Sequence, residues 1–170
     1  MFPVIADLKH PSRAAIVLSP TQRKAADEIL LALQRDHCAV LQDHGSNGKS
    51  TVLDHIHDAL GGSRVGAREF LSALSARDPA GIEEAFLDLM DAHMDAHDLV
   101  ILDDLHLIKE VVEGYDYPRQ RLFDVVMTAL LAKMSVAGKK LVFATSEVPA
   151  ALARRGHRIA LSIWMPRTSG

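Results

Sequence analysis

The residues best suited to chemistry lie in one short glycine-bearing segment, which follows an apolar run and precedes a helical pattern. The segment consists of Gly45, Ser46, Asn47, Gly48, Lys49, Ser50 and Thr51. Successive backbone N–H groups in such a loop form a concave anion site, and the positive end of the following helix adds to it. Gly48 has no Cβ to obstruct a phosphate, Lys49 can reach phosphate oxygens, and the hydroxyl of Ser50 can bind Mg²⁺. Strand, loop and helix in this order predict a binding site for the phosphates of a nucleoside triphosphate.

This segment departs from the usual phosphate-loop pattern, G-x-x-x-x-G-K-[ST], at its first position. Asp43 stands where the first glycine is expected, and a glycine, Gly45, occurs two residues later. A carboxylate repels phosphate unless it turns away, so we expect the orientation of Asp43 to affect affinity. The alternative interpretation is a Gly-Lys-Ser turn that only caps a helix.

Two further candidates, Asp103 and Asp104, follow a continuous apolar run over residues 99–102. Ligands of open α/β sheets bind at the carboxyl ends of strands. We therefore expect Asp103 to lie beside Mg²⁺, directly or through a water, and Asp104 to polarise an attacking water. The alternative is an aspartate pair that only caps a helix or forms a turn; its position downstream of the phosphate loop favours the functional interpretation.

The elements that must position these residues alternate between strands and helices. The predicted strands cover residues 37–42, 64–65, 99–102, 141–145 and 158–164, and the predicted helices cover residues 20–35, 51–60, 68–77, 82–95, 119–136 and 149–155. A loop is predicted over residues 111–118. Continuously apolar strands that alternate with helices predict an α/β protein with the P-loop NTPase fold, a three-layer α/β/α sandwich around a mostly parallel five-stranded sheet. The expected organisation is an arm over residues 1–18, a core domain over 19–166 and a tail over 167–170.

The composition is that of an ordinary globular chain, with 48% hydrophobic and 24% charged residues and a formal net charge of −3. This balance gives no overall attraction to nucleic acid, although Arg154, Arg155 and Arg158 form a local basic group. The single cysteine, Cys38, excludes an intrachain disulfide. No long apolar run and no signal-peptide pattern is evident, so we expect a cytoplasmic protein without a membrane partner.

These motifs together resemble those of the AAA+ ATPase family, over residues 19–166. The phosphate loop is similar to Walker A, and residues 99–104 resemble Walker B, with Asp-Asp as in the replication-initiator and helicase-loader branch. The long helix before the strand at 141–145 also resembles that branch. The resemblance implies that Thr145 or Ser146 is the sensor 1 residue, whose hydroxyl holds the attacking water or senses the γ-phosphate.

The segment over residues 149–155 resembles the part of the family that carries an arginine finger. The resemblance implies that Arg155, with Arg154 as the alternative, reaches the site of a neighbouring subunit; a solvated basic turn or a nucleic-acid contact is the competing interpretation. In the family a helical lid with a sensor 2 arginine follows the last strand. This sequence ends at Gly170 and contains the core subdomain without that lid; a piece of a longer protein and a minimal core are the two alternatives.

The resemblance implies an ATPase that uses ATP and Mg²⁺ to remodel or load a protein or nucleoprotein partner, in DNA replication or transposition. It further implies ADP as product and a homo-oligomer or assembly with other ATPase subunits. A nucleotide-dependent binding or assembly switch with little hydrolysis is the alternative. A small-molecule kinase is a third reading, but no acceptor pocket is evident in the sequence.

Overall fold

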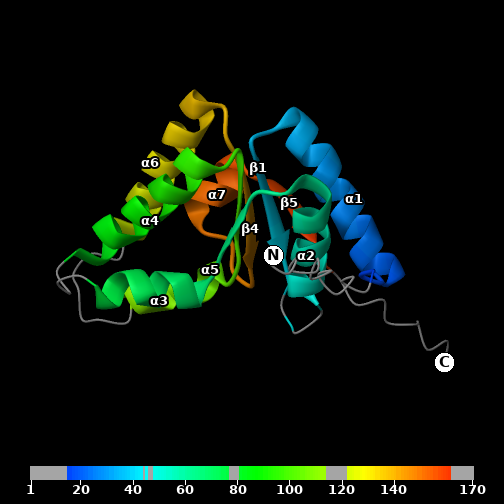
Figure 1. Cartoon of the computed structure of the whole chain (residues 1–170), viewed down its shortest axis with the longest axis horizontal. Helices are drawn as coiled ribbons and strands as arrows, with labels where there is room; N and C mark the ends of the chain where they lie inside the picture. The colour runs from blue at the N-terminus through cyan, green and yellow to red at the C-terminus, as the bar shows by residue number, and fades with distance from the viewer. Residues whose placement is uncertain (1–14, 44, 46–47, 77–80, 114–121, 162–170) are drawn as a thin grey trace, which may run out of the picture.

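The computed structural model describes residues 15–43, 45, 48–76, 81–113 and 122–161. Helices and strands alternate along the chain in Figure 1. The helices are α1 (Pro20–Arg35), α2 (Lys49–Leu60), α3 (Ala67–Ser75), α4 (Ile82–Ala96), α5 (Leu105–Glu113), α6 (Leu122–Ala137) and α7 (Ala150–Arg155). The strands are β1 (Cys38–Gln42), β2 (Ser63–Val65), β3 (Leu99–Leu102), β4 (Lys140–Thr145) and β5 (His157–Ala160).

The five strands form one sheet in the order β2-β3-β4-β1-β5, and every pair is parallel. Parallel alignment places the carboxyl ends of all strands at one edge. The residues after β1, β3 and β4 therefore meet there, although they are far apart in the sequence. The predicted five-stranded parallel sheet is thus confirmed.

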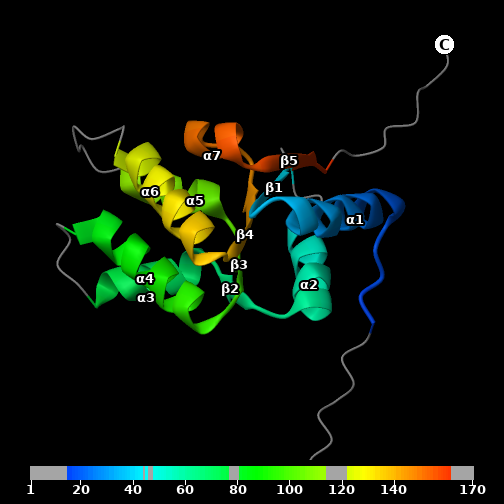
Figure 2. The same cartoon turned by 90° about the horizontal axis from the view of Figure 1, so that it is seen from above.

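Helices cover both faces of the sheet, which gives the predicted three layers. Figure 2 shows α1 and α2 on one side of the strands and α3 to α7 on the other. Side chains alternate between the faces along each strand: Ala39 and Leu41 pack with the buried residues of α1 and α2, whereas Val40 packs with those of α4 and α6. Both faces of the central strands are therefore buried, which explains why their sequences are continuously apolar.

The start of α1 follows the pattern expected of its sequence. The hydroxyl of Ser19 accepts a hydrogen bond from the backbone N–H of Gln22, and the Gln22 side chain accepts one from the Ser19 N–H. Such a reciprocal cap satisfies two N–H groups that the helix leaves without partners. The cap also carries Gln22 toward the phosphate loop, where it lies against Gly48.

Several predicted ends differ from the structure by one or two residues, and two predictions near residues 111 and 161 differ by more. The loop predicted over residues 111–118 is helical up to Glu113, where α5, which begins at Leu105, ends. Residues 114–118 lie outside the described part of the chain. Leu105 and Ile108 are fully buried on one face of this short helix, and Asp104 caps its start. The last strand ends at Ala160 and leaves Leu161 outside it; residues 162–164 are not described.

Candidate functional site

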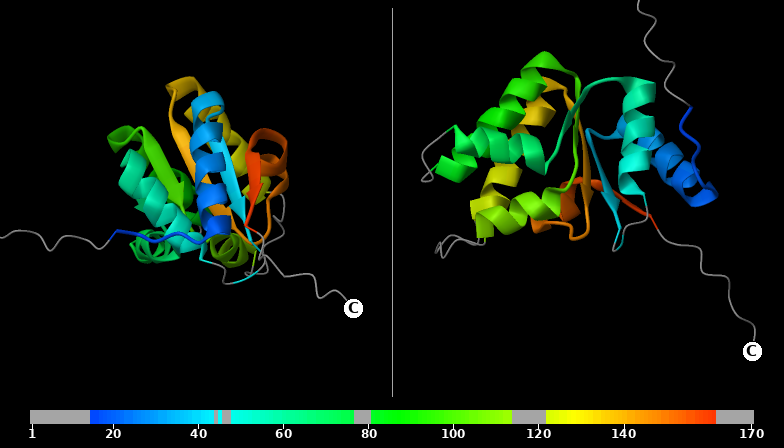
Figure 3. Two further views of the ribbon diagram at one scale, coloured as in Figure 1. Left: turned by 90° about the vertical axis from the view of Figure 1, so that its right-hand side faces the viewer. Right: turned by 60° about the horizontal axis from the view of Figure 1, so that its bottom comes forward.

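A hollow of about 490 Å³ lies at the carboxyl edge of the sheet. This edge of the sheet is at the bottom of Figure 1, and the right-hand view of Figure 3 turns it toward the viewer. The walls of the hollow come from the ends of β1, β3 and β4 and from the start of α2. The lining residues are Asp43, Gly45, Gly48, Lys49, Ser50, Asp104, His106 and Ser146. Five of these, Gly45, Gly48, Lys49, Ser50 and Asp104, belong to the predicted site, and Ser146 was one of two alternatives.

The phosphate loop is shaped by a backbone conformation that glycine favours. Gly48 has φ +82° and immediately precedes α2, in the left-handed region that L side chains rarely adopt. A Cβ on Gly48 would also collide with the amide nitrogen of the Gln22 side chain. The Gln22 amide is the end of a flexible side chain and can move aside, so the positive φ is the stronger reason for glycine at position 48. Ser46 and Asn47 lie outside the described residues, and Thr51 is half-buried in the first turn of α2.

Asp43 turns into the loop rather than away from it. Its carboxylate accepts a hydrogen bond from the Gly45 N–H at 3.1 Å, and its Oδ2 lies 3.7 Å from Lys49 Nζ. The Asp43 side chain is only 2% exposed and that of Lys49 14%. Lys49 Nζ also donates to the Gly45 carbonyl at 3.1 Å. Asp43 thus binds the N–H group and the amine that a phosphate would use.

Ser50 and Asp103 form the contact that joins the two motifs. The Ser50 hydroxyl donates to Asp103 Oδ2 at 3.3 Å, across 53 residues of sequence. Because the Ser50 hydroxyl donates its hydrogen bond to Asp103, the lone pairs of the Ser50 oxygen can be directed at a cation. The other oxygen of Asp103 accepts the backbone N–H of Asp104 at 2.9 Å.

Arg64, which was not a candidate in the sequence analysis, lies on β2 beside this contact. Its Nη2 donates to Asp103 Oδ2 at 2.9 Å, and its Nη1 donates to Asp54 Oδ1 on α2. Asp54 was not a candidate either. One signal was available in the sequence. Arg64 lies in a short predicted strand, and burial of a charged side chain in a sheet costs free energy unless it has a partner.

Asp104 is held in an unusual conformation at the mouth of the hollow. It is the non-glycine residue with positive φ, +55°, in the described chain, and its carbonyl accepts hydrogen bonds from the N–H groups of Leu107 and Ile108. Burial, followed by the neighbouring Asp103 carboxylate, raises the pKa of Asp104, and His106, Lys49 and Arg64 partly offset this. Strained backbone and a raised pKa gather at functional sites more often than elsewhere.

The two candidates for the sensor position are separated by their surroundings. Thr145 is fully buried, and its hydroxyl donates to the Glu147 carbonyl at 2.6 Å. Ser146 lines the hollow, and its carbonyl accepts a hydrogen bond from the Gln42 side chain at 3.3 Å. Gln42 in turn accepts one from Arg158 at 2.6 Å. The geometry favours Ser146 as the residue that contacts a ligand, with Thr145 fixing the turn behind it.

Arg155 lies away from the hollow of its own chain. It ends α7, directly before β5, whose first residue pairs with Ala39 near the start of β1. The phosphate loop follows the opposite end of β1, so Arg155 and its neighbour Arg154 lie at the amino edge of the sheet. Both are exposed. Neither arginine can therefore complete the site of its own chain without a large rearrangement.

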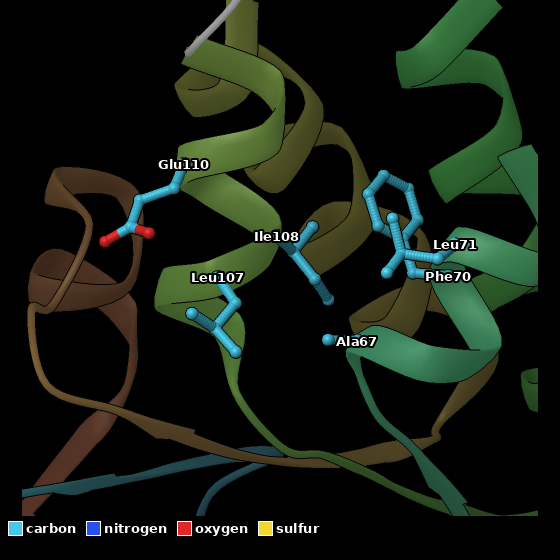
Figure 4. A pocket seen from close by; sticks show the side chains of 6 residues that line it. All are labelled: Ala67, Phe70, Leu71, Leu107, Ile108 and Glu110. Carbon is cyan, nitrogen blue, oxygen red and sulfur yellow. The ribbon is translucent and has the colours of Figure 1, made fainter.

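A second hollow, of about 360 Å³, lies between α3 and α5. Figure 4 shows the side chains that line it: Ala67, Phe70, Leu71, Leu107, Ile108 and Glu110. All except Glu110 are apolar, so this hollow lacks the donors that phosphate needs.

The donors at the first hollow fit Mg²⁺ bound together with phosphate. Within the described ranges, no three His, Cys, Asp or Glu side chains are arranged to hold a metal ion by themselves. Mg²⁺ seldom occupies such an all-protein cage; it is usually held by one or two protein oxygens, waters and substrate phosphates. Ser50 lines the hollow and can supply one such oxygen, and the Asp103 carboxylate lies next to it, hydrogen-bonded to the Ser50 hydroxyl.

Two solved structures of the replication initiation protein DnaA have folds similar to this one. Domain III of the replication initiation protein DnaA from Thermotoga maritima superposes with a TM-score of 0.59 and 15% identity, over 86% of this chain and 64% of that one. AMPPCP-bound DnaA from Aquifex aeolicus gives a TM-score of 0.54 and 15% identity, over 91% of this chain and 51% of that one. The chain therefore spans less than two thirds of either structure.

These comparisons confirm the predicted fold: the chain shares the layered α/β architecture of DnaA domain III, built here on a parallel five-stranded sheet. No protein-family model matches the sequence, and no curated protein has a similar sequence. No helix in the described part of the chain is long and apolar enough to cross a membrane.

Proposed function

We propose that this chain binds ATP with Mg²⁺ at the carboxyl edge of its sheet and hydrolyses the terminal phosphate bond. The observation that carries the proposal is the hydrogen bond between Ser50 and Asp103, 3.3 Å long, next to the amine of Lys49. It joins a phosphate-loop residue to the end of a second buried strand. One of the similar structures, DnaA from Aquifex aeolicus, contains the ATP analogue AMPPCP, which supports a nucleotide as the ligand.

Each residue has a distinct part in the proposed reaction. Lys49 and the N–H groups at the start of α2 bind phosphate oxygens, and Ser50 with Asp103 holds the cation. Bound Mg²⁺ supplies charge neutralisation for the phosphates. Asp104 accepts a hydrogen bond from the attacking water, and Ser146 orients that water or contacts the γ-phosphate.

Separate substitutions of Lys49 and Asp104 distinguish binding from hydrolysis. Lys49→Ala removes the phosphate-binding amine and is expected to abolish nucleotide binding. Asp104→Asn preserves the shape of the side chain and is expected to retain binding but stop turnover. The assays are equilibrium nucleotide binding and phosphate release at saturating Mg·ATP; normal turnover in both variants would refute the proposal.

The work done by hydrolysis is proposed to be the remodelling or loading of a protein or nucleoprotein partner. The fold is similar to that of domain III of DnaA, a replication initiation protein. Because Arg155 lies at the opposite edge of the sheet, it could act as an arginine finger only at the hollow of another chain, so this role requires an assembly of several subunits. We propose Arg155, or Arg154, as that finger. ATP turnover per chain that rises with protein concentration in the native protein, but not in Arg155→Ala, would support this role. The same dependence on concentration in both proteins would count against it.

A switch with little hydrolysis is the second candidate, and Asp43 is the observation that favours it. Its carboxylate already engages Lys49 and the Gly45 N–H, so binding of nucleotide must displace an internal anion. Such a site would favour slow exchange between a loop occupied by Asp43 and a loop occupied by nucleotide over rapid ATP turnover. Phosphate release at saturating Mg·ATP, alone and with added partner, separates the candidates: a switch binds ATP yet releases almost no phosphate in either condition.

A further inference from the structure

Arg64 connects three elements of the site through its guanidinium group. From β2 it donates to Asp103 at the end of β3 and to Asp54 on α2, the helix that follows the phosphate loop. The Arg64 side chain is 29% exposed and that of Asp103 12%. A guanidinium is a planar fork with donors in fixed directions, so two carboxylates bound to it are fixed in position as well.

We propose that Arg64 is a positioning residue for the Mg²⁺ end of the site: it keeps the Asp103 carboxylate turned toward Ser50. This inference rests on the proposed function. Asp103 Oδ2 accepts hydrogen bonds from both Ser50 and Arg64, and Oδ1 accepts the Asp104 N–H. Removal of Arg64 frees one side of this carboxylate to rotate, and the Ser50 hydroxyl then loses its fixed acceptor.

Asp54 gives Arg64 a second role in the same arrangement. It lies on α2, one turn beyond Ser50, and the ion pair with Arg64 ties this helix to β2 and β3. Ser50 and Asp103, which supply the two oxygens of the cation site, are thereby held close together before any ligand binds. Preorganisation of this kind lowers the cost of binding a metal that demands strict geometry.

The positive charge of Arg64 also repels a cation near Asp103. Removal of Arg64 could therefore raise or lower the affinity for Mg²⁺, and the direction can be measured. Loss of an outer hydrogen-bonding partner typically costs roughly 10- to 100-fold in metal affinity. Loss of a repulsive charge would act in the opposite direction. Because the Arg64 guanidinium is paired with both Asp54 and Asp103, much of its charge is neutralised, and orientation is expected to dominate.

The test is the Mg²⁺ dependence of ATP binding to the full chain, measured by calorimetry over a Mg²⁺ series and in EDTA. Arg64→Gln is expected to raise the half-saturating Mg²⁺ concentration roughly 10-fold or more, with less than about a 2-fold change in ATP affinity in EDTA. Arg64→Lys retains the charge but not the fork, and is expected to recover only part of the loss. Asp54→Ala, which removes only the link to α2, is expected to give a smaller rise than Arg64→Gln. Lys139→Gln is the matched control, because its ion pair with Asp98 lies at the other edge of the sheet.

Four results would overturn the inference. An unchanged or lower Mg²⁺ requirement in Arg64→Gln would mean that Arg64 acts only as a competing cation. An equal loss in EDTA and in Mg²⁺ would mean a general structural role, and a loss of the same size in Lys139→Gln would mean a nonspecific charge effect. If Arg64→Gln does not fold, Arg64→Lys and Asp54→Ala carry the test, and a normal Mg²⁺ requirement in both overturns it. Failure of wild-type protein to bind ATP at any Mg²⁺ concentration would instead refute the proposed function.

Discussion

Asp43 is the residue whose replacement should most improve nucleotide binding. A phosphate oxygen bonded to Lys49 Nζ would lie at most about 6.5 Å from Asp43 Oδ2, given the 3.7 Å between Lys49 and Asp43 and a charge-assisted bond of about 2.8 Å. At an effective dielectric constant of about 20, repulsion at that distance is about 2.5 kcal/mol per unit charge. Asparagine removes this repulsion, and its carbonyl can still accept the Gly45 N–H.

We therefore expect Asp43→Asn to strengthen ATP binding by about 2 kcal/mol, which is roughly a 30-fold lower Kd. Screening by salt makes the effect smaller at high ionic strength, so calorimetric titrations at low and high salt should diverge. Asp98→Asn, which removes a carboxylate that is 97% exposed at the other edge of the sheet, is the control and should leave the Kd unchanged. An unchanged or higher Kd in Asp43→Asn would contradict repulsion between Asp43 and phosphate. It would mean that the contribution of Asp43 to the shape of the loop outweighs that repulsion.

Three further predictions concern stability and reactivity. Because the pKa of Asp104 is raised in the folded state, its negative charge destabilises the folded protein at pH 7, and this effect disappears below the unfolded pKa of about 3.9. Asp104→Asn should therefore raise the melting temperature at pH 7, and the difference from wild type should shrink toward pH 4. A difference that does not depend on pH would exclude charge as the cause. Burial, together with the nearby Asp36, raises the pKa of Cys38 to about 12, so native protein should resist iodoacetamide at pH 8 and react only on unfolding, as mass spectrometry can show; rapid native labelling would contradict this burial. Gly62 has φ +92° and lies against the carbonyl oxygen of Leu99, whereas Gly138 has φ +67° with open space around it; urea unfolding should show a loss of more than about 2 kcal/mol for Gly62→Ala and about 1 kcal/mol for Gly138→Ala, and equal losses would mean that the close approach has no energetic weight.

The sequence was sufficient for the parts of the site that depend on local pattern. An apolar run, a glycine-bearing loop and a helical period define β1, the phosphate loop and α2, and the same logic finds β3 with Asp103 at its end. Parallel pairing then brings these ends together, since all carboxyl ends of a parallel sheet lie at one edge. The predicted alternation of strands and helices was enough to imply this arrangement.

Side-chain directions and long-range ion pairs could not be predicted in the same way. The orientation of Asp43 depends on its partners Gly45 and Lys49 in the folded loop, and the pattern said only that a glycine was missing. Arg64 meets its partners across 10 and 39 residues, and β2 is too short for a periodic signal. The α5 helix was missed for a related reason: its apolar face, which includes Leu105 and Ile108, spans few turns.

Calorimetric titration of Mg·ATP into wild-type protein, Lys49→Ala and Lys139→Ala measures directly whether the carboxyl edge of the sheet binds nucleotide. Lys49 lies in the hollow beside Asp43, whereas Lys139 pairs with Asp98 at the opposite edge. We predict saturable binding of one ATP per chain to wild type and Lys139→Ala, and none to Lys49→Ala at the same concentrations. Absence of binding to folded wild-type protein, or equal binding to all three proteins, would contradict a nucleotide site at this edge of the sheet.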